Sequence, residues 1–149
     1  MKQNRIILIL LFIVLSFNNL EAPEHKMIYI IETPAIHYIS PERLLQKLRE
    51  NGIKYHLIVW RQAMLESNYI KSRLAIEGRN LFGMKHNNRG YSIGEIYGHA
   101  NYPYYNDCIK DYKTWQDLYY KRGDYYEFLV RIGYAEDENY TNKLKKIKL

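Results

Sequence analysis

The 149-residue sequence contains a single cysteine, Cys108. One cysteine cannot form an intramolecular disulfide, which excludes a small domain held together by disulfide bonds, and Cys108 is expected to be a small core residue. Phenylalanine is also scarce, with 4 residues against 16 tyrosines. Because tyrosine joins an apolar ring to a polar hydroxyl, this excess suits a groove that holds sugars, nucleobases or peptides, and it suits half-buried packing equally well.

Acidic residues are fewer than basic ones, since 16 Asp and Glu against 22 Lys and Arg give a net charge of +6. A composition of 47% hydrophobic and 26% charged residues excludes both a disordered chain and an all-membrane protein. The length fits one domain. The positive charge favours an anionic partner.

Long apolar runs are absent apart from residues 6–15, ten consecutive apolar residues behind a short positive segment. A membrane-spanning helix needs about 20 such residues, so residues 1–22 are predicted to be a signal peptide or an uncleaved signal anchor. Residues 23–37 are expected to be a linker, and residues 38–149 the folded domain. Export to the periplasm, cell envelope or exterior would favour an anionic envelope polymer over intracellular nucleic acid as the partner.

The remaining sequence predicts a mainly α domain. Ser40 and Pro41 can cap and start a helix that Gly52 ends. Residues 57–65 are apolar nearly all round, as expected for a buried helix. Residues 78–98 hold five of the eight glycines and no helical period, which predicts a loop or a small β-hairpin lobe. Three further helices are expected to begin at Asn106 or Asp107, at Asp124 and at Asp137.

Glu66 breaks the apolar pattern at the end of the second predicted helix. Burial there would disfavour the ionised carboxylate and raise its pKa. That condition suits an acid that must hold its proton near neutral pH and pass it to a leaving group. The alternative is a glutamate that simply turns outward into solvent at the helix end.

An ordered series of motifs resembles the bacterial glucosaminidase family, peptidoglycan hydrolases that include the flagellar muramidase and autolysins. The matching segments are Glu66-Ser67, Ser72, Asn80-Leu81-Phe82-Gly83-Met84-Lys85, Tyr102-Pro103, residues 107–112 with Trp115, and residues 133–140. The resemblance spans roughly residues 38–149 and implies a lysozyme-like, α-rich fold. Asn68 and Arg79 depart from the residues usual in the family.

The resemblance implies a role for each matching residue. Glu66 corresponds to the general acid, and Tyr134 to a tyrosine that supports the transition state or the substrate. Substrate-binding positions are expected at Asn80, Phe82, Lys85 and Tyr102, with Phe82 anchoring its loop in the core and Tyr102 offering a ring on which a sugar could stack. Trp60 and Trp115 are expected to be core residues.

A second carboxylate is harder to place. In two-carboxylate glycosidases the partner lies about 5–10 Å from the acid. Glu95, inside the glycine-rich segment, is the natural candidate, while Glu77, Asp107 and Asp111 are poorer ones. Alternatively, the 2-acetamido group of the substrate attacks the anomeric carbon, which predicts retention of configuration, whereas Glu95 acting as base for water predicts inversion.

Other chemistries have weaker support. His86 and His99 form the only pair worth considering for zinc, without nearby cysteine or acidic ligands, so neither a metal nor a cofactor is expected. Cys108 falls on an apolar helix face, where a nucleophile would lack access. The sequence thus predicts a monomeric glycosidase that cleaves β-1,4 bonds in peptidoglycan as an endo-β-N-acetylglucosaminidase. The alternatives are muramidase specificity and a catalytically weak glycan-binding module.

Overall fold

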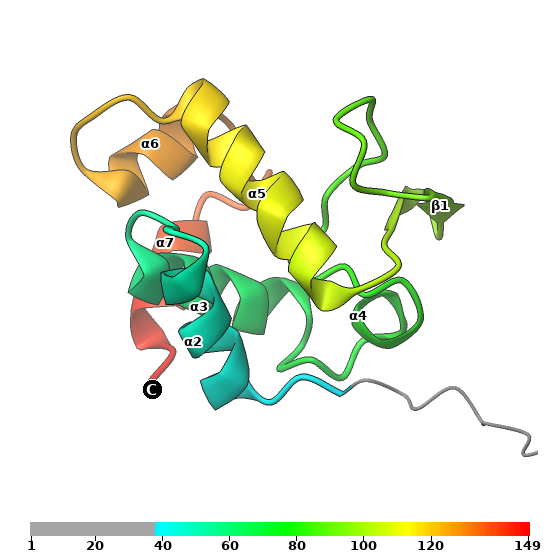
Figure 1. Cartoon of the computed structure of the whole chain (residues 1–149). Helices are drawn as coiled ribbons and strands as arrows, with labels where there is room; N and C mark the ends of the chain where they lie inside the picture. The colour runs from blue at the N-terminus through cyan, green and yellow to red at the C-terminus, as the bar shows by residue number, and fades with distance from the viewer. Residues whose placement is uncertain (1–37) are drawn as a thin grey trace, which may run out of the picture. The chain divides into compact units, whose positions relative to one another are not determined.

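A computed structural model describes residues 38–149 (Figure 1). All of these residues belong to one unit of the chain. The predicted signal segment and linker, residues 1–22 and 23–37, lie outside the described part. The elements are, in order, α2 (Pro41–Glu50), α3 (His56–Glu66), α4 (Arg73–Glu77), β1 (Gly94–Ile96), β2 (His99–Asn101), α5 (Tyr105–Tyr119), α6 (Tyr125–Arg131) and α7 (Tyr140–Lys146). The mainly α fold with a small hairpin lobe confirms the predicted fold class.

Helix starts follow the capping chemistry of the sequence in two of the four predicted cases. The Ser40 hydroxyl accepts a hydrogen bond from the Arg43 amide at 3.2 Å at the start of α2. Asp124 accepts one from the Glu127 amide at 2.9 Å at the start of α6. The other two starts were misplaced, because α5 begins directly after Tyr104 and α7 after Asn139, neither with a side-chain cap.

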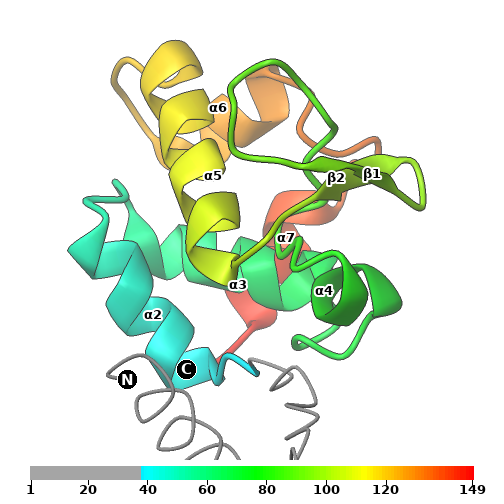
Figure 2. The same ribbon diagram turned by 45° about the vertical axis from the view of Figure 1, so that its right-hand side comes forward.

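The central helix is α3, which contacts α2 on one side and α7 on another (Figure 2). Val59, Ala63 and Met64 of α3 are fully buried, as the apolar sequence of this helix predicts. Trp60 is buried as expected, and its indole N–H donates to the Pro41 carbonyl at 2.9 Å. Helices α5 and α6 contribute the buried rings of Tyr112, Tyr125 and Phe128 to the core.

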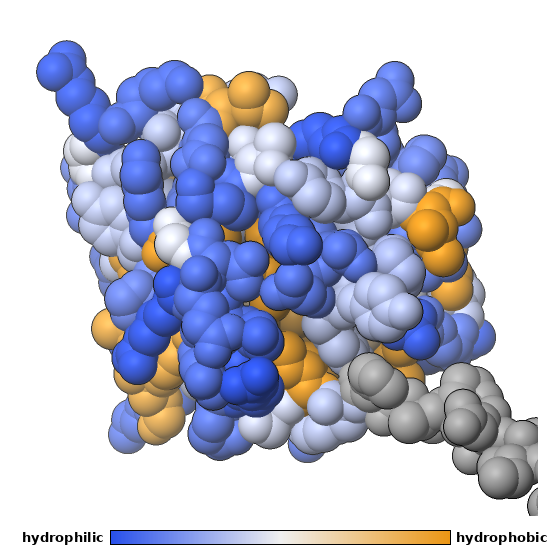
Figure 3. All heavy atoms as spheres, in the orientation of Figure 1, coloured by the Kyte–Doolittle hydropathy of each residue, from blue (hydrophilic) through white to orange (hydrophobic). Residues whose placement is uncertain are grey.

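The lobe is a two-stranded antiparallel hairpin in which Glu95 lies opposite Ala100. Tyr97 and Gly98 form its turn, both with positive φ (53° and 70°), the conformation that lets a tight turn match the strand twist. The outer surface in Figure 3 is largely hydrophilic, with separate apolar patches. Within residues 38–149, no helix is long and apolar enough to cross a membrane.

Candidate active site

An open groove of about 580 Å³ lies at the C-terminal end of α3, where Glu66 emerges. We divide its lining into two sets by origin. The helical side comprises Glu66, Trp115, Tyr119 and residues 132–135. The lobe side comprises residues 82–87, Arg89 and His99. Residues far apart in the sequence therefore meet around one carboxyl group.

Glu66 is half-buried, and its Oε1 accepts a hydrogen bond of 2.7 Å from the Tyr140 hydroxyl. Burial raises the pKa of the Glu66 carboxyl above its usual value, while the hydrogen bond from Tyr140 opposes that rise. A raised pKa is the property expected of a general acid that must stay protonated near neutral pH.

Gly83 keeps space open beside this acid. A side chain at Gly83 would begin 3.6 Å from Glu66 Oε2, and the backbone there has φ +66°, a left-handed conformation that favours glycine. The family-like loop after α4 thus brings backbone, without a side chain, up to the carboxyl.

A buried polar network lies behind Glu66. Gln62 Nε2 lies 3.5 Å from the Tyr140 hydroxyl oxygen, and Gln62 Oε1 accepts a 2.7 Å hydrogen bond from the Tyr112 hydroxyl. Tyr112 in turn meets the Tyr125 hydroxyl at 2.9 Å. The network restricts the movement of Tyr140, which donates a hydrogen bond to the Glu66 carboxyl. Three of the 16 tyrosines, Tyr112, Tyr125 and Tyr140, are thus buried, hydrogen-bonded groups.

Tyr134 lines the groove on its helical side. Its hydroxyl donates to the Phe82 carbonyl at 2.9 Å, and its ring lies edge-on to Trp115 with centroids 5.3 Å apart. Burial places the pKa of Tyr134 well above its usual value, helped by the neighbouring Tyr140 and Glu66. The hydroxyl therefore stays protonated and connects the helical side to the lobe side.

Asn80 differs from its expected role in substrate binding, because it is buried beneath the groove. Its Nδ2 donates to the Met84 and Ala100 carbonyls at 2.8 and 2.9 Å, and its Oδ1 accepts from the Phe82 and Met84 amides. These four hydrogen bonds use both donors and the acceptor of the Asn80 amide, so Asn80 stabilises the loop and does not bind a ligand. Phe82 lines the groove but is itself buried against Tyr112, as an anchor of the loop should be.

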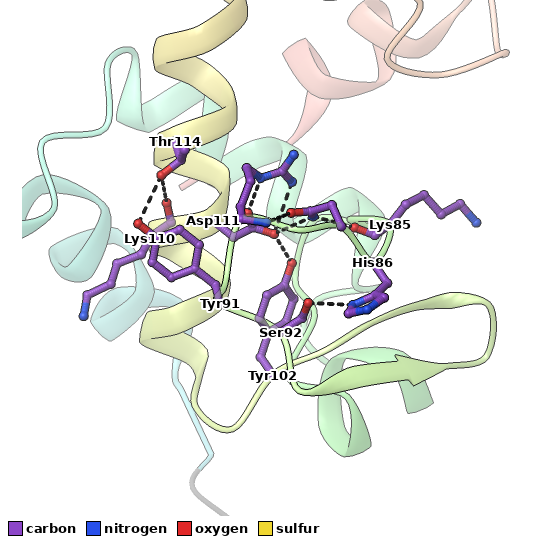
Figure 4. Close-up of polar contacts among 10 residues, drawn as sticks. Lys85, His86, Tyr91, Ser92, Tyr102, Lys110, Asp111 and Thr114 are labelled. Atoms are coloured by element: carbon purple, nitrogen blue, oxygen red, sulfur yellow. Dashed lines mark hydrogen bonds and ion pairs between the residues drawn. The ribbon is translucent and has the colours of Figure 1, made fainter.

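Tyr102 also differs from expectation, since it is fully buried and does not line the groove. Its hydroxyl donates to Asp111 Oδ2 at 2.6 Å, and burial raises its pKa far above the usual value (Figure 4). Asp111 also forms an ion pair with Arg89 and accepts from Asn87 Nδ2 at 3.3 Å. This buried carboxylate therefore attaches the segment after Lys85 to α5.

Glu95 is exposed on β1 and is not among the residues that line the groove. Glu77 is exposed as well, paired with Arg73 and Tyr97, and Asp107 lies outside the groove. Within residues 38–149, Glu66 is the only carboxylate in the groove lining. The structure thus brings together Glu66, Tyr134, Phe82 and Lys85, and it leaves out Glu95, Asn80 and Tyr102.

The two histidines of the lobe line the groove but have separate partners. His86 Nδ1 lies 2.8 Å from the Ser92 hydroxyl, and His99 contacts Lys85. The described part of the chain holds no cluster of three groups suited to a metal ion. Cys108 is fully buried and burial raises the pKa of its thiol, as expected for a core residue.

Helix α5 presents two aromatic residues to the groove, Trp115, which was expected in the core, and Tyr119, which the sequence did not single out. Trp115 is half-buried and lines it beside Tyr134, and Tyr119, one turn later, is half-exposed there. Both residues follow Tyr112 at helical spacing and therefore share a face with it, but spacing alone does not show where that face leaves the core.

Comparison with known families gives a match over residues 42–148 to the glucosaminidase family, described as mannosyl-glycoprotein endo-beta-N-acetylglucosaminidase. The chain belongs to this glucosaminidase family. No curated protein and no solved structure matches it. Membership indicates a glycoside hydrolase whose substrate is a glycan, which agrees with an open groove that holds one carboxyl group and several aromatic rings.

Proposed function

We propose that this glucosaminidase hydrolyses β-1,4 glycosidic bonds in the glycan strands of peptidoglycan, as an endo-β-N-acetylglucosaminidase with Glu66 as general acid. The observation that carries the proposal is a carboxyl in the groove lining whose pKa burial raises. The +6 charge supports an anionic polymer as substrate. Such a polymer lies outside the cytoplasm, so the proposal includes export, with the N-terminal apolar segment as signal peptide or membrane anchor.

In the proposed reaction, protonated Glu66 donates its proton to the glycosidic oxygen as the bond to the anomeric carbon breaks. Because no second described carboxylate lines the groove, the 2-acetamido group of the sugar supplies the nucleophile, and water then opens the cyclic intermediate. Tyr134 supports the sugar through its ring, since its hydroxyl is engaged by the Phe82 carbonyl. Proton NMR of the first products should therefore show retention of the β configuration, and an initial α anomer would contradict this route.

Clearing of purified cell walls tests the activity. The wild-type chain should clear walls, and Glu66→Gln should bind them without clearing. A general acid typically contributes about 10²–10⁴-fold to the rate, so residual activity of Glu66→Gln should be in that range below wild type. Equal clearing by both proteins would overturn the assignment of the acid.

A glycan-binding module is the second candidate, favoured by the lone carboxylate of the groove. It is supported if neither protein clears walls while both co-sediment with them. If the wild type does clear walls, mass spectrometry of the reduced digestion products shows which glycosidic bond is cleaved. Reduced N-acetylglucosamine at the new end indicates the proposed specificity, and reduced N-acetylmuramic acid indicates a muramidase.

A further inference from the structure

Lys85 occupies a defined place on the lobe side of the groove. Its ammonium nitrogen donates to the Gly98 carbonyl at 3.0 Å and lies 3.3 Å from His99 Nε2. Both partners belong to the hairpin, so the lysine is held by the lobe although it follows the Asn80 loop in sequence. The ammonium group is therefore positioned before any ligand arrives.

The contacts of His99 fix how Lys85 is held. His99 Nδ1 lies 2.8 Å from the Tyr97 carbonyl oxygen, which can only accept, so Nδ1 carries the ring hydrogen. Nε2 is then the acceptor for the Lys85 ammonium. Two neutral acceptors thus use two of the three ammonium hydrogens, which leaves the full positive charge and one hydrogen for a ligand.

The groove does not neutralise this charge. Arg89, the other strong cation of the lining, is paired with the buried Asp111. None of the ion pairs formed within residues 38–149 involves Lys85. Among the described residues, Glu66 is the one carboxyl in the lining, and burial favours its neutral form. A cation without a counter-charge among the described residues therefore lies in the same groove as the proposed acid.

We propose that Lys85, held by Gly98 and His99, is a specificity-determining residue that binds a carboxylate carried by the glycan strand. This inference rests on the proposed function and adds which part of the polymer is recognised. Two groups on such strands offer this chemistry, the lactyl carboxylate of muramic acid where no peptide is attached and the acidic residues of the stem peptide. A charge-assisted hydrogen bond to either one fixes the register of the strand relative to Glu66.

The test compares strands with and without charge. Peptide-bearing strands and amidase-stripped strands are each used as they are and after conversion of their carboxylates to methylamides. The wild type, Lys85→Met and the control Lys71→Met are compared by kcat/KM. Lys71 has the same charge, an exposed side chain and no place in the groove lining. Dissociation constants for the same four strands are measured in the Glu66→Gln background, so that binding is read independently of cleavage.

The wild type and Lys71→Met should prefer a charged strand over its methylamide by about tenfold, and Lys85→Met should lower that ratio toward one. A preference confined to peptide-bearing strands assigns the carboxylate to the stem peptide, and one seen in stripped strands assigns it to the lactyl group. An unchanged ratio in Lys85→Met overturns the proposal, as does a wild type that ignores charge. If no strand is cleaved, the proposed function fails, and the ratio of dissociation constants still decides the role of Lys85.

Discussion

The helical side of the groove and the lobe side are held in place by different means. Glu66, Trp115 and Tyr134 rest on buried rings and on the polar network behind Tyr140. The lobe side depends largely on two buried polar side chains, Asn80 and Asp111, which bind its backbone and its Arg89. In the proposed reaction, the helical side supplies the proton and aromatic rings that face the sugar, whereas the lobe side supplies the positive charge of Lys85.

Asn80→Ala tests the lobe anchor and should have the largest effect on stability. The substitution removes four hydrogen bonds around buried backbone groups and should lower the free energy of unfolding by about 3 kcal/mol in urea titrations. Asn88→Ala, at an exposed position of the same segment, should change it by less than about 0.5 kcal/mol. Similar losses for both variants would show that Asn80 does not anchor the lobe.

Asp111→Asn tests the second anchor. It leaves Arg89 without its counter-charge and should cost about 2 kcal/mol of stability, with faster amide exchange in residues 85–92. Combining it with Arg89→Met in a double-mutant cycle should recover part of that loss. Asp117→Asn, in the exposed pair with Lys113, should cost less than about 0.5 kcal/mol. Additive losses for Asp111 and Arg89 would contradict the pairing.

Tyr119→Ala probes the helical side where it faces the substrate. Loss of its ring should raise KM about fivefold, or about 1 kcal/mol, with kcat nearly unchanged. The adjacent Leu118 is equally exposed but lies outside the groove, so Leu118→Ala is the matched control and should leave KM unchanged. A fall in kcat without a change in KM would instead place Tyr119 in the chemistry.

Tyr140→Phe should give the smallest effect, a shift in pH dependence. The Tyr140 hydrogen bond lowers the pKa of Glu66, so its loss should raise that pKa further. A general acid loses activity as pH rises through its pKa, and the alkaline limb of kcat/KM should therefore move to higher pH. Tyr104→Phe, at an exposed position, should leave the limb in place. A shift to lower pH would contradict the proposed hydrogen bond to Glu66.

The two sides also differ in how well their residues could be predicted from the sequence alone. On the helical side, the carboxyl at the end of an apolar helix marked Glu66 as either buried or turned outward, and the family-like motifs indicated Glu66 and Tyr134. The lobe side depends on which polar groups turn inward. Asn80 and Tyr102 have residue types that suit sugar binding, yet Asn80 bonds to Ala100, 20 residues later, and Tyr102 bonds to Asp111 in the helix that follows it. Such tertiary hydrogen bonds have no signature in sequence spacing.

The contacts of Lys85 were also not predictable from the sequence. The family-like motif indicated that Lys85 binds substrate, but its hydrogen-bond partners, Gly98 and His99, depend on the fold of the hairpin. Likewise, Glu95 is exposed on β1 opposite Ala100, and it is not among the residues that line the groove. Only the fold could show that the natural candidate for a second acid lies outside the groove.

The most direct test of this account compares Glu66→Gln with Glu95→Gln in initial rates of cell-wall hydrolysis. Each substitution removes one carboxyl and keeps the size of the side chain. The account predicts a loss of about 10²–10⁴-fold for Glu66→Gln and a change of less than about twofold for Glu95→Gln. A comparable loss in Glu95→Gln would contradict the single-carboxylate groove, and full activity in Glu66→Gln would contradict the assignment of the acid.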